Sequence, residues 1–171
     1  LPPGVLDRQL QWLKDNNYTI VSAEQVYDYE INGVPLPPKP IMLSFDDNDG
    51  SQFTDARPLL DKYGFKGVFF IMTVTIDKEN FMTADQIKQL DKEGHDIEPH
   101  TGDHHMVTDY TTDADWQQQI VEPNKTLDNL LGHPPPFLAS PFGLSSADAY
   151  PKPKAYLSNG GDPRKRACAG A

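Results

Sequence analysis

Two adjacent carboxylates, those of Asp46 and Asp47, are the first side chains in the sequence whose types and spacing suggest chemistry. They follow a mostly apolar run that begins at Ile41 and precede a polar turn that contains Gly50. The apolar run predicts a buried strand that ends at the acid pair. Charged side chains rarely follow a buried strand without a partner. We therefore expect the pair to meet a cation or to take part in proton transfer, with two solvated turn residues as the plain alternative.

Four of the five histidines lie between residues 95 and 105, and two of them, His100 and His104, are spaced i, i+4. On a helical turn this spacing places both imidazoles on one face, although it also arises by chance in pairs of solvated histidines. Two histidines and one carboxylate are a common ligand set for catalytic Zn²⁺ with an open position for water. A second aspartate, ionised at neutral pH, can accept a proton from that water. The two pairs together therefore predict a hydrolytic metal site.

The same acidic stretch has a competing interpretation. The segment DNDGS at residues 47–51 resembles the DxDG[ST] loop of haloacid-dehalogenase-type phosphatases, in which the first aspartate attacks phosphorus and Mg²⁺ is bound. Under this alternative, Asp47 and Asp49 serve a magnesium-dependent phosphatase. It leaves the histidine cluster without a role and places Asp46 in the strand as an unexplained charge. It therefore ranks below the metal-hydrolase interpretation.

The elements that must position these groups alternate along the chain. Apolar residues at helical spacing, N-cap residues and glycine stops predict helices at 5–13, 23–29, 56–63, 83–93 and 112–131. Short apolar runs between them predict strands near 18–22, from 41, at 67–72 and at 95–100, and one more strand and turn at 137–143. This alternation favours an α/β fold of βαβ units around a parallel sheet or barrel. In both arrangements ligands bind at the carboxyl ends of the strands, where Asp46, His100 and the turn at 141–143 all fall.

Length and charge restrict the class of protein. At 171 residues the chain is long enough for one domain with a substantial core. We assign that domain to residues 1–150 and an irregular basic tail to residues 151–171, with a last short strand in the tail as the alternative. Residues 1–150 contain 10 Lys and Arg against 24 Asp and Glu. This acidity argues against nucleic acid and anionic membranes as partners.

Compartment signals are sparse. No apolar run approaches the roughly 20 residues that span a bilayer. The chain starts at LPPGVL without the charged and apolar regions of a signal peptide, so we expect such a peptide to be absent or already removed. The single cysteine, Cys168, argues against a disulfide framework and a Cys-based metal site.

Three short segments, LSFDDND, HTGDH and SPFG, resemble in order and separation the first three motifs of the polysaccharide deacetylase family, the NodB homology domain of carbohydrate esterase family 4. The residues around them are similar to secreted members that act on cell-wall or biofilm glycans, and the resemblance covers roughly residues 5–150. It implies a distorted (β/α) barrel, usually of seven strands. It also implies removal of acetyl groups from a polysaccharide, such as the N-acetyl groups of N-acetylglucosamine-type glycans, outside the cell or in the cell envelope.

The resemblance assigns roles residue by residue. Asp46 is expected to be the catalytic base, and Asp47, His100 and His104 are expected to bind Zn²⁺ or another divalent transition metal. Phe142 occupies the position whose backbone N–H contributes to the oxyanion hole. Together these groups would activate a water and stabilise the tetrahedral oxyanion of acetyl hydrolysis.

The sequence departs from the family pattern after the third motif. The late histidine that acts as general acid has no counterpart, because no histidine follows His133. Only 28 residues follow Gly143, so we expect a barrel that is incomplete at its C-terminus, with an exposed apolar sheet edge and either self-association or marginal stability. Ala139 replaces the usual arginine and Asn48 the usual glycine. The alternative function is a catalytically impaired glycan-binding relative that keeps the metal site.

Several other side chains near the motifs have candidate roles. His105 and His133 are candidates for a substitute acid, although an ordinary solvated or structural role is favoured for both. Asp103 is a candidate for orienting a metal-binding imidazole. Tyr110 and Trp116, with Phe142, are candidates for lining a sugar groove, although core packing is the more common role for aromatic residues.

Overall fold

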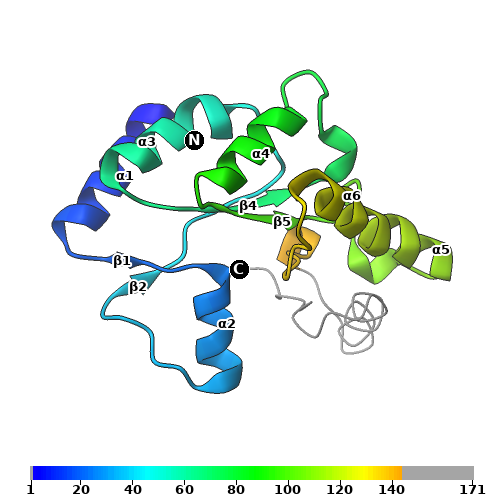
Figure 1. Ribbon diagram of the computed structural model, residues 1–171, viewed down its shortest axis with the longest axis horizontal. Helices are drawn as coiled ribbons and strands as arrows, with labels where there is room; N and C mark the ends of the chain where they lie inside the picture. Colours follow the sequence, from blue (N-terminus) through cyan, green and yellow to red (C-terminus); the bar gives the residue numbers. More distant parts are fainter. Residues whose placement is uncertain (1, 144–171) are drawn as a thin grey trace.

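The structure of the chain is a computed structural model that describes residues 2–143. Helices and strands alternate along it (Figure 1). The helices are α1 (Pro3–Asp15), α2 (Ala23–Asn32), α3 (Arg57–Tyr63), α4 (Ala84–Lys92), α5 (Asp113–Trp116) and α6 (Glu122–Leu131). The strands are β1 (Thr19–Ile20), β2 (Pro40–Ile41), β3 (Ser44–Phe45), β4 (Val68–Ile71) and β5 (Asp96–Pro99). The tail expected at 151–171 lies outside the described residues.

The named strands pair in parallel, as the alternating pattern predicted. β1 pairs with β2, and a second sheet has the order β3–β4–β5. The connections within that second sheet carry α3 and α4, so the sheet is built of βαβ units. Figure 1 shows α1, α3 and α4 on one side of β4 and β5, and α2 on the other. Because β3 and β5 run in the same direction, their carboxyl ends lie at one edge of the sheet.

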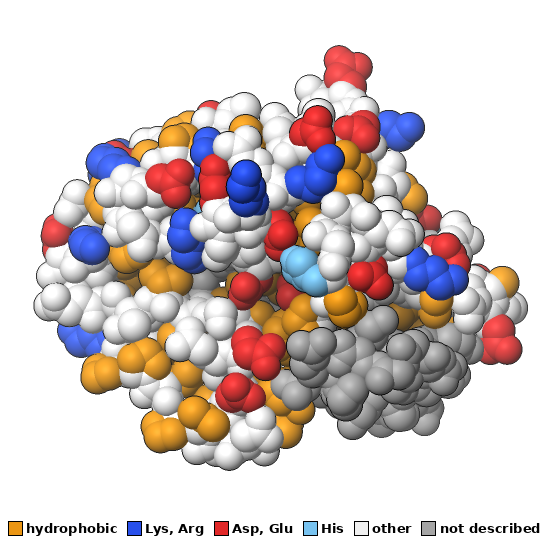
Figure 2. All heavy atoms as spheres, viewed as in Figure 1, with side chains coloured by type: hydrophobic (Ala, Val, Ile, Leu, Met, Phe, Trp, Pro, Cys, Tyr) orange, Lys and Arg blue, Asp and Glu red, His pale blue; other side chains and the backbone are white. Residues whose placement is uncertain are grey.

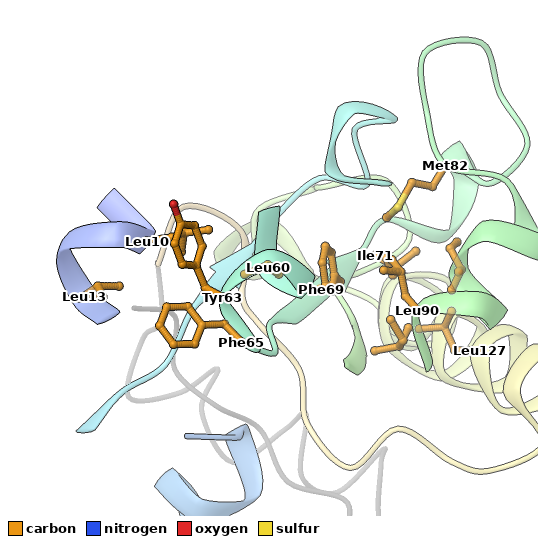
Figure 3. Packing of buried hydrophobic residues seen from close by; sticks show 12 residues of the cluster. Leu10, Leu13, Leu60, Tyr63, Phe65, Phe69, Ile71, Met82, Leu90 and Leu127 are labelled. Atoms are coloured by element: carbon orange, nitrogen blue, oxygen red, sulfur yellow. The ribbon is translucent and has the colours of Figure 1, made fainter. Parts of the chain in front are cut away.

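The central strand β4 is buried on both faces, which explains its uninterrupted apolar sequence. Phe69 and Ile71 enter the main core, whose side chains Figure 3 shows. Val68 and Phe70 belong to a second cluster on the opposite face, together with Phe137. Each fully buried large side chain stabilises the fold by roughly 1.5–3 kcal/mol. The main core draws on four helices through Leu10, Leu60, Leu90 and Leu127.

Several helix ends follow the predicted capping signals. Ser22 begins α2 with a capping box, in which its hydroxyl accepts the Gln25 N–H at 3.1 Å and the Gln25 side chain accepts the Ser22 N–H at 2.9 Å. Thr83 forms the same arrangement at α4. α3 ends at Gly64, which adopts φ 72°, a left-handed conformation that glycine tolerates well.

Two helical regions contain a π-helical segment. The segment η1 (Gln52–Ala56) precedes α3, and η4 (Gln117–Val121) joins α5 to α6. The prediction of one helix over 112–131 was therefore right in extent. It was wrong in that the segment η4 has π-helical hydrogen bonds in place of α-helical ones. Pro58 and Pro123 lie in the first turns of α3 and α6. Proline has no N–H for the helical ladder, so the helix can widen locally just before it.

The strand predicted from Ile41 is in fact two short strands. The Val21 N–H donates to the Ile41 carbonyl, whereas the Val68 N–H donates to the Leu43 carbonyl. The segment thus changes its partner from β1 to β4 between these residues. Ser44 in β3 is exposed, so the prediction of a continuous buried strand was also wrong in its second half.

The segment 137–143, predicted as a strand and a turn, contains the turn as the 3-10 segment η5 (Pro141–Gly143), whereas the stretch before η5 is irregular. Two backbone groups of the stretch before η5 form hydrogen bonds with side chains of β5 and of the residue that follows β5. The Phe137 N–H donates to the Glu98 carboxylate at 2.8 Å, and the Ala139 carbonyl lies 3.0 Å from His100 Nδ1. These side-chain bonds compete with a regular strand ladder.

The described surface includes exposed apolar side chains around α2 (Figure 2). Tyr29, Ile31 and Val34 are 49%, 64% and 50% exposed. The self-association expected from exposed apolar surface stays a prediction. Among residues 2–143, no helix is both long and apolar enough to cross a membrane.

Candidate functional site

Asp47, His100 and His104 come together at the carboxyl edge of the sheet. Their ligand atoms all lie within 4.8 Å of one another. Asp47 Oδ1 is 3.6 Å from His100 Nε2 and 3.3 Å from His104 Nε2. Ligand bonds of roughly 2.0–2.2 Å in a tetrahedral zinc site place neighbouring ligand atoms about 3.3–3.5 Å apart. The three side chains therefore fit one small divalent cation, with the fourth position left to water or substrate.

Asp47 reaches this site through an unusual backbone conformation. Asp47 and Asn48 adopt φ 74° and 61°, in the left-handed region that Asp and Asn tolerate better than most residues. Asn48 is fully buried, and its side-chain amide donates to the Thr75 hydroxyl at 3.0 Å. The Met82 N–H donates to the Asn48 carbonyl at 3.0 Å. Two bonds thus hold Asn48, at the position where the resemblance implies a glycine.

His100 is the most deeply buried member of the site, with 3% of its surface exposed. Its Nδ1 lies 3.0 Å from the Ala139 carbonyl, which can only accept a hydrogen bond. Nδ1 therefore carries the proton, and the Nε2 lone pair faces Asp47. Burial lowers the pKa of His100, which keeps the imidazole in the neutral form that metals bind.

The turn between the two histidines is not helical, contrary to the expectation from their spacing. Thr101 and His104 adopt φ 64° and 66°, and the Thr101 hydroxyl accepts the His104 N–H at 3.1 Å. Left-handed conformations cost roughly 1–2 kcal/mol per residue. The imidazoles of His100 and His104 nevertheless face each other, with ring centroids 4.8 Å apart. The expected juxtaposition therefore holds, through a different backbone.

Asp46 stands beside the ligands with an exposed side chain. Its charge is near enough to favour protonation of His100, although burial outweighs this effect. Its carbonyl accepts a bond from the Gln52 side chain. The geometry thus leaves the Asp46 carboxylate accessible next to the predicted metal ligands.

Phe142, in the turn η5, lies against the same site. The residue is 65% exposed, and its ring contacts that of His104 edge-on, with centroids 4.6 Å apart. Its backbone adopts φ 60° and ψ 10°. The third motif therefore meets the second at His104, a predicted metal ligand, while the role of the Phe142 N–H stays a prediction.

Two aromatic candidates for a sugar groove are core residues instead. Tyr110 and Trp116 are 7% and 3% exposed and pack edge to face, with ring centroids 5.0 Å apart. They form a cluster with Ile120 and Leu138. Burial raises the pKa of Tyr110 well above its ordinary value. Both residues thus contribute to packing, as aromatic residues commonly do.

The remaining candidate polar residues have local partners. His133 Nε2 lies 2.9 Å from Asp91 Oδ1, as in an exposed structural pair. Asp103 accepts the His105 N–H at 3.1 Å. The group that orients the His100 imidazole is the backbone carbonyl of Ala139 and not the predicted Asp103. The types of residues in a sequence do not reveal such a backbone partner.

Glu98 was missed by the sequence reasoning, although a carboxylate between two apolar residues of a predicted strand is a readable signal. It is 3% exposed and lies two residues before His100 on β5. Burial raises the pKa of Glu98 well above its ordinary value, and burial also raises that of Asp96. Both carboxyls line a cavity of about 380 Å³ together with His133.

The phosphatase interpretation finds little support in the geometry. Asp49 Oδ1 accepts both the Ser51 N–H, at 2.9 Å, and the Ser51 hydroxyl. These bonds lower the pKa of Asp49 and tie its carboxylate to the start of η1. Asp47 approaches the histidines instead of pairing with Asp49 around a common cation.

A second group of possible ligands, Asp61, Glu93 and His95, also lies within 4.8 Å. Its atoms are largely committed to protein partners. Both oxygens of Glu93 accept bonds from Arg57, at 2.7 and 2.6 Å, and these bonds lower the pKa of Glu93 to about 2 although burial opposes the shift. His95 Nδ1 accepts the Gly67 N–H at 3.1 Å. An arginine beside the group further disfavours a cation.

Comparisons of the sequence with known proteins agree on one family. A family model described as polysaccharide deacetylase matches residues 33–156. The poly-β-1,6-N-acetyl-D-glucosamine N-deacetylase of Staphylococcus aureus (strain MRSA252) is 26% identical over 158 residues, which cover 85% of this chain and 54% of that protein. The Bacillus subtilis (strain 168) protein YxkH is 26% identical over 143 residues, which cover 84% of this chain and 51% of YxkH. The chain thus spans about half the length of these curated relatives.

Solved structures agree with the fold. The Streptococcus pyogenes deacetylase PplD, solved in complex with acetate, is similar with a TM-score of 0.83 and 25% identity, over 90% of this chain and 69% of that one. A polysaccharide deacetylase from Bacillus cereus is similar with a TM-score of 0.77 and 24% identity, over 90% of this chain and 48% of that one.

Proposed function

This chain belongs to the polysaccharide deacetylase family, and we propose that it hydrolyses acetyl groups of a polysaccharide with a metal centre formed by Asp47, His100 and His104. The observation that carries the proposal is the meeting of these three ligand atoms within 4.8 Å, beside the exposed carboxylate of Asp46. The sheet edge that holds them is where parallel α/β folds place their active sites.

Zn²⁺ is the proposed metal, since two imidazoles and one carboxylate at these distances suit a tetrahedral cation. When bound, it polarises the acetyl carbonyl and lowers the pKa of a water. The protein holds His100 ready for this role, because the Ala139 carbonyl fixes the proton on Nδ1. Other divalent transition metals share the same ligand preferences.

Asp46 is the proposed catalytic base. Its carboxylate is exposed next to Asp47 and can take the proton of the attacking water as the water oxygen bonds to the acetyl carbon. The Phe142 N–H is proposed to donate to the oxygen that becomes negative in this step. The contact between the Phe142 ring and His104 brings that backbone next to the ligands.

The proposed substrate is an N-acetylglucosamine-type glycan outside the cell or in its envelope. The name of the Staphylococcus aureus relative supports this substrate class. A glycan-binding relative without turnover is the second candidate, since His133, considered as a substitute acid, is paired with Asp91. Release of acetate decides between the two.

The test combines zinc content with acetate release from N-acetylglucosamine oligomers. We expect about one zinc per wild-type chain, and acetate release that Asp46→Asn abolishes while zinc is retained. His100→Ala should lose both zinc and activity. Asp49→Asn is the matched control and should keep both, because Asp49 bonds to Ser51 and not to the ligands. Zinc without acetate favours the binding relative, and unchanged zinc in His100→Ala excludes the proposed centre.

A further inference from the structure

The two π-helical segments, η1 and η4, share one sequence spacing. Each begins with a glutamine that stands six residues before a proline, Pro58 or Pro123. In both, the residue after the segment donates its N–H to the carbonyl of the first residue, the i to i+5 bond of a π-turn. A proline at that point removes a donor from the helical ladder, which explains why the helix widens in both places.

Each π-segment presents a buried glutamine to a loop of the metal centre. Gln52, in η1, is 8% exposed, and its Nε2 donates to the Asp46 carbonyl. Gln119, in η4, is 5% exposed, and its Oε1 accepts the N–H groups of Gly102 and Asp103 at 3.1 and 3.2 Å. One glutamine therefore contacts the loop of the acid pair, and the other contacts the turn between the two histidines.

The hydrogen-bonding partners of Gln52 and Gln119 determine whether each side-chain amide uses its NH₂ group or its oxygen. The Asp46 carbonyl can only accept, so Gln52 must offer its NH₂ group. The N–H groups of Gly102 and Asp103 can only donate, so Gln119 must offer its carbonyl oxygen. The same residue type thus performs opposite hydrogen-bonding tasks at the two positions.

Both loops need such support, because both contain strained backbone. Asp47 in the first loop and Thr101 and His104 in the second adopt positive φ angles. Conformations of this kind persist where the surroundings over-determine them. The second loop also rests directly on η4, since a Cβ added to Gly102 would lie 3.0 Å from the Gln118 carbonyl oxygen.

We propose that Gln52 and Gln119 are positioning residues that set the distance between Asp47 and the histidine pair through these bonds. The inference rests on the proposed function in that Asp47, His100 and His104 bind the metal. Neither glutamine touches the ligand atoms. Their loss is expected to weaken metal binding through displaced loops, as for groups that orient a ligand from behind.

The test uses one chemical change at both positions, Gln→Glu, with Zn²⁺ as the probe in a titration against a competing chelator. Gln119→Glu keeps an acceptor oxygen, so zinc affinity should stay within about threefold of wild type. Gln52→Glu replaces the donor with a second acceptor facing the Asp46 carbonyl, so affinity should fall about 10- to 100-fold. Gln119→Met removes the acceptor oxygen, so zinc affinity should fall by the same factor in this variant.

A matched control removes a buried amide that does not contact the site. Asn124 on α6 is 4% exposed, and its Nδ2 donates to the Ile120 carbonyl. Asn124→Leu should leave zinc affinity unchanged. If it weakens zinc binding as much as Gln119→Met does, a general packing effect explains both and the proposal is overturned. If Gln52→Glu does not fold, Gln52→Met replaces it with the same expected loss.

The imidazole NMR signals of the metal-free chain give a readout that is independent of zinc. Gln119→Met should shift the signals of His100 and His104 and leave in place that of His95, which lies at the other end of β5. Unchanged signals together with unchanged zinc affinity would overturn the proposal. A wild type that binds no zinc would instead remove the proposed function, and the NMR signals would still decide the positioning role.

Discussion

The candidate metal centre has two differently built halves. The histidine half, His100 and His104, follows the buried strand β5, and His100 is 3% exposed with its imidazole fixed by a carbonyl. The aspartate half, Asp46 and Asp47, follows the two-residue strand β3, and the Asp47 side chain is 53% exposed. The comparison suggests that the two halves have different roles. The buried half fixes the orientation of the ligand imidazole, and the exposed half leaves the site open to the cation and the substrate.

This division has an energetic basis. A buried, hydrogen-bonded imidazole has already lost its rotamer freedom on folding, so binding a cation costs it little further entropy. An exposed carboxylate still has freedom to lose, but it meets water and ligands without any opening of the fold. The two halves should therefore respond differently to substitution.

The largest expected difference concerns the stability of the metal-free chain. His100→Ala should lower the free energy of unfolding by about 2–4 kcal/mol, because it leaves a cavity and an unpaired carbonyl. Asp47→Asn should change it by less than about 0.5 kcal/mol. Zinc affinity should fall more than about 100-fold in both. Urea unfolding and zinc titration measure these quantities, and equal destabilisation would remove the distinction between the halves.

A second prediction uses acid to weaken the start of β5, the strand that leads to the histidine half. Burial lowers the pKa of His95 to about 4, whereas in the unfolded chain it titrates near 6.5. Below pH 6.5 the unfolded state therefore binds more protons, so this stabilisation is complete above pH 6.5 and declines as pH falls towards 4. The loss between pH 8 and pH 5 should be about 2 kcal/mol.

His95→Gln isolates this effect, since glutamine can still accept the Gly67 N–H. Urea unfolding of both proteins at several pH values gives the difference between them. That difference should change by about 2 kcal/mol between pH 8 and pH 5. A constant difference across this range would mean that His95 titrates normally in the folded chain.

The smallest effect is expected at the rim of the site. Phe142 is 65% exposed, so Phe142→Ala should change the free energy of unfolding by less than about 0.5 kcal/mol. Zinc affinity should fall by less than about tenfold, because the ring only contacts the edge of His104. The same unfolding and titration experiments measure both. A larger loss of affinity would place the Phe142 ring among the groups that hold His104.

Much of the fold could be predicted from local signals. The capping boxes at Ser22 and Thr83 and the glycine stop at Gly64 set helix ends through bonds between near neighbours in sequence. The apolar run of β4 reflects burial on both faces. Features that depend on distant partners were not predicted, such as the change of strand partner between Ile41 and Leu43.

The candidate site was predicted in composition but not in detail. The acid pair and the histidine pair predicted a metal site from their residue types, and the family resemblance selected Asp47 as the carboxylate that joins His100 and His104. The left-handed turn between the histidines was not foreseen, because its N–H groups bond to Gln119, a partner distant in sequence that no motif indicates. The bond from His100 to the Ala139 carbonyl could not be predicted either, because every residue has a backbone carbonyl.

The central strand β4 contributes none of the three proposed ligands, yet it separates the two strands that precede them. Asp47 and His100 can therefore meet only after β3, β4 and β5 have docked through two crossover connections, which is slow compared with local helix formation. A cation that recognises only the docked sheet slows unfolding without speeding folding. The metal centre would thus prolong the lifetime of the folded sheet and take no part in its nucleation.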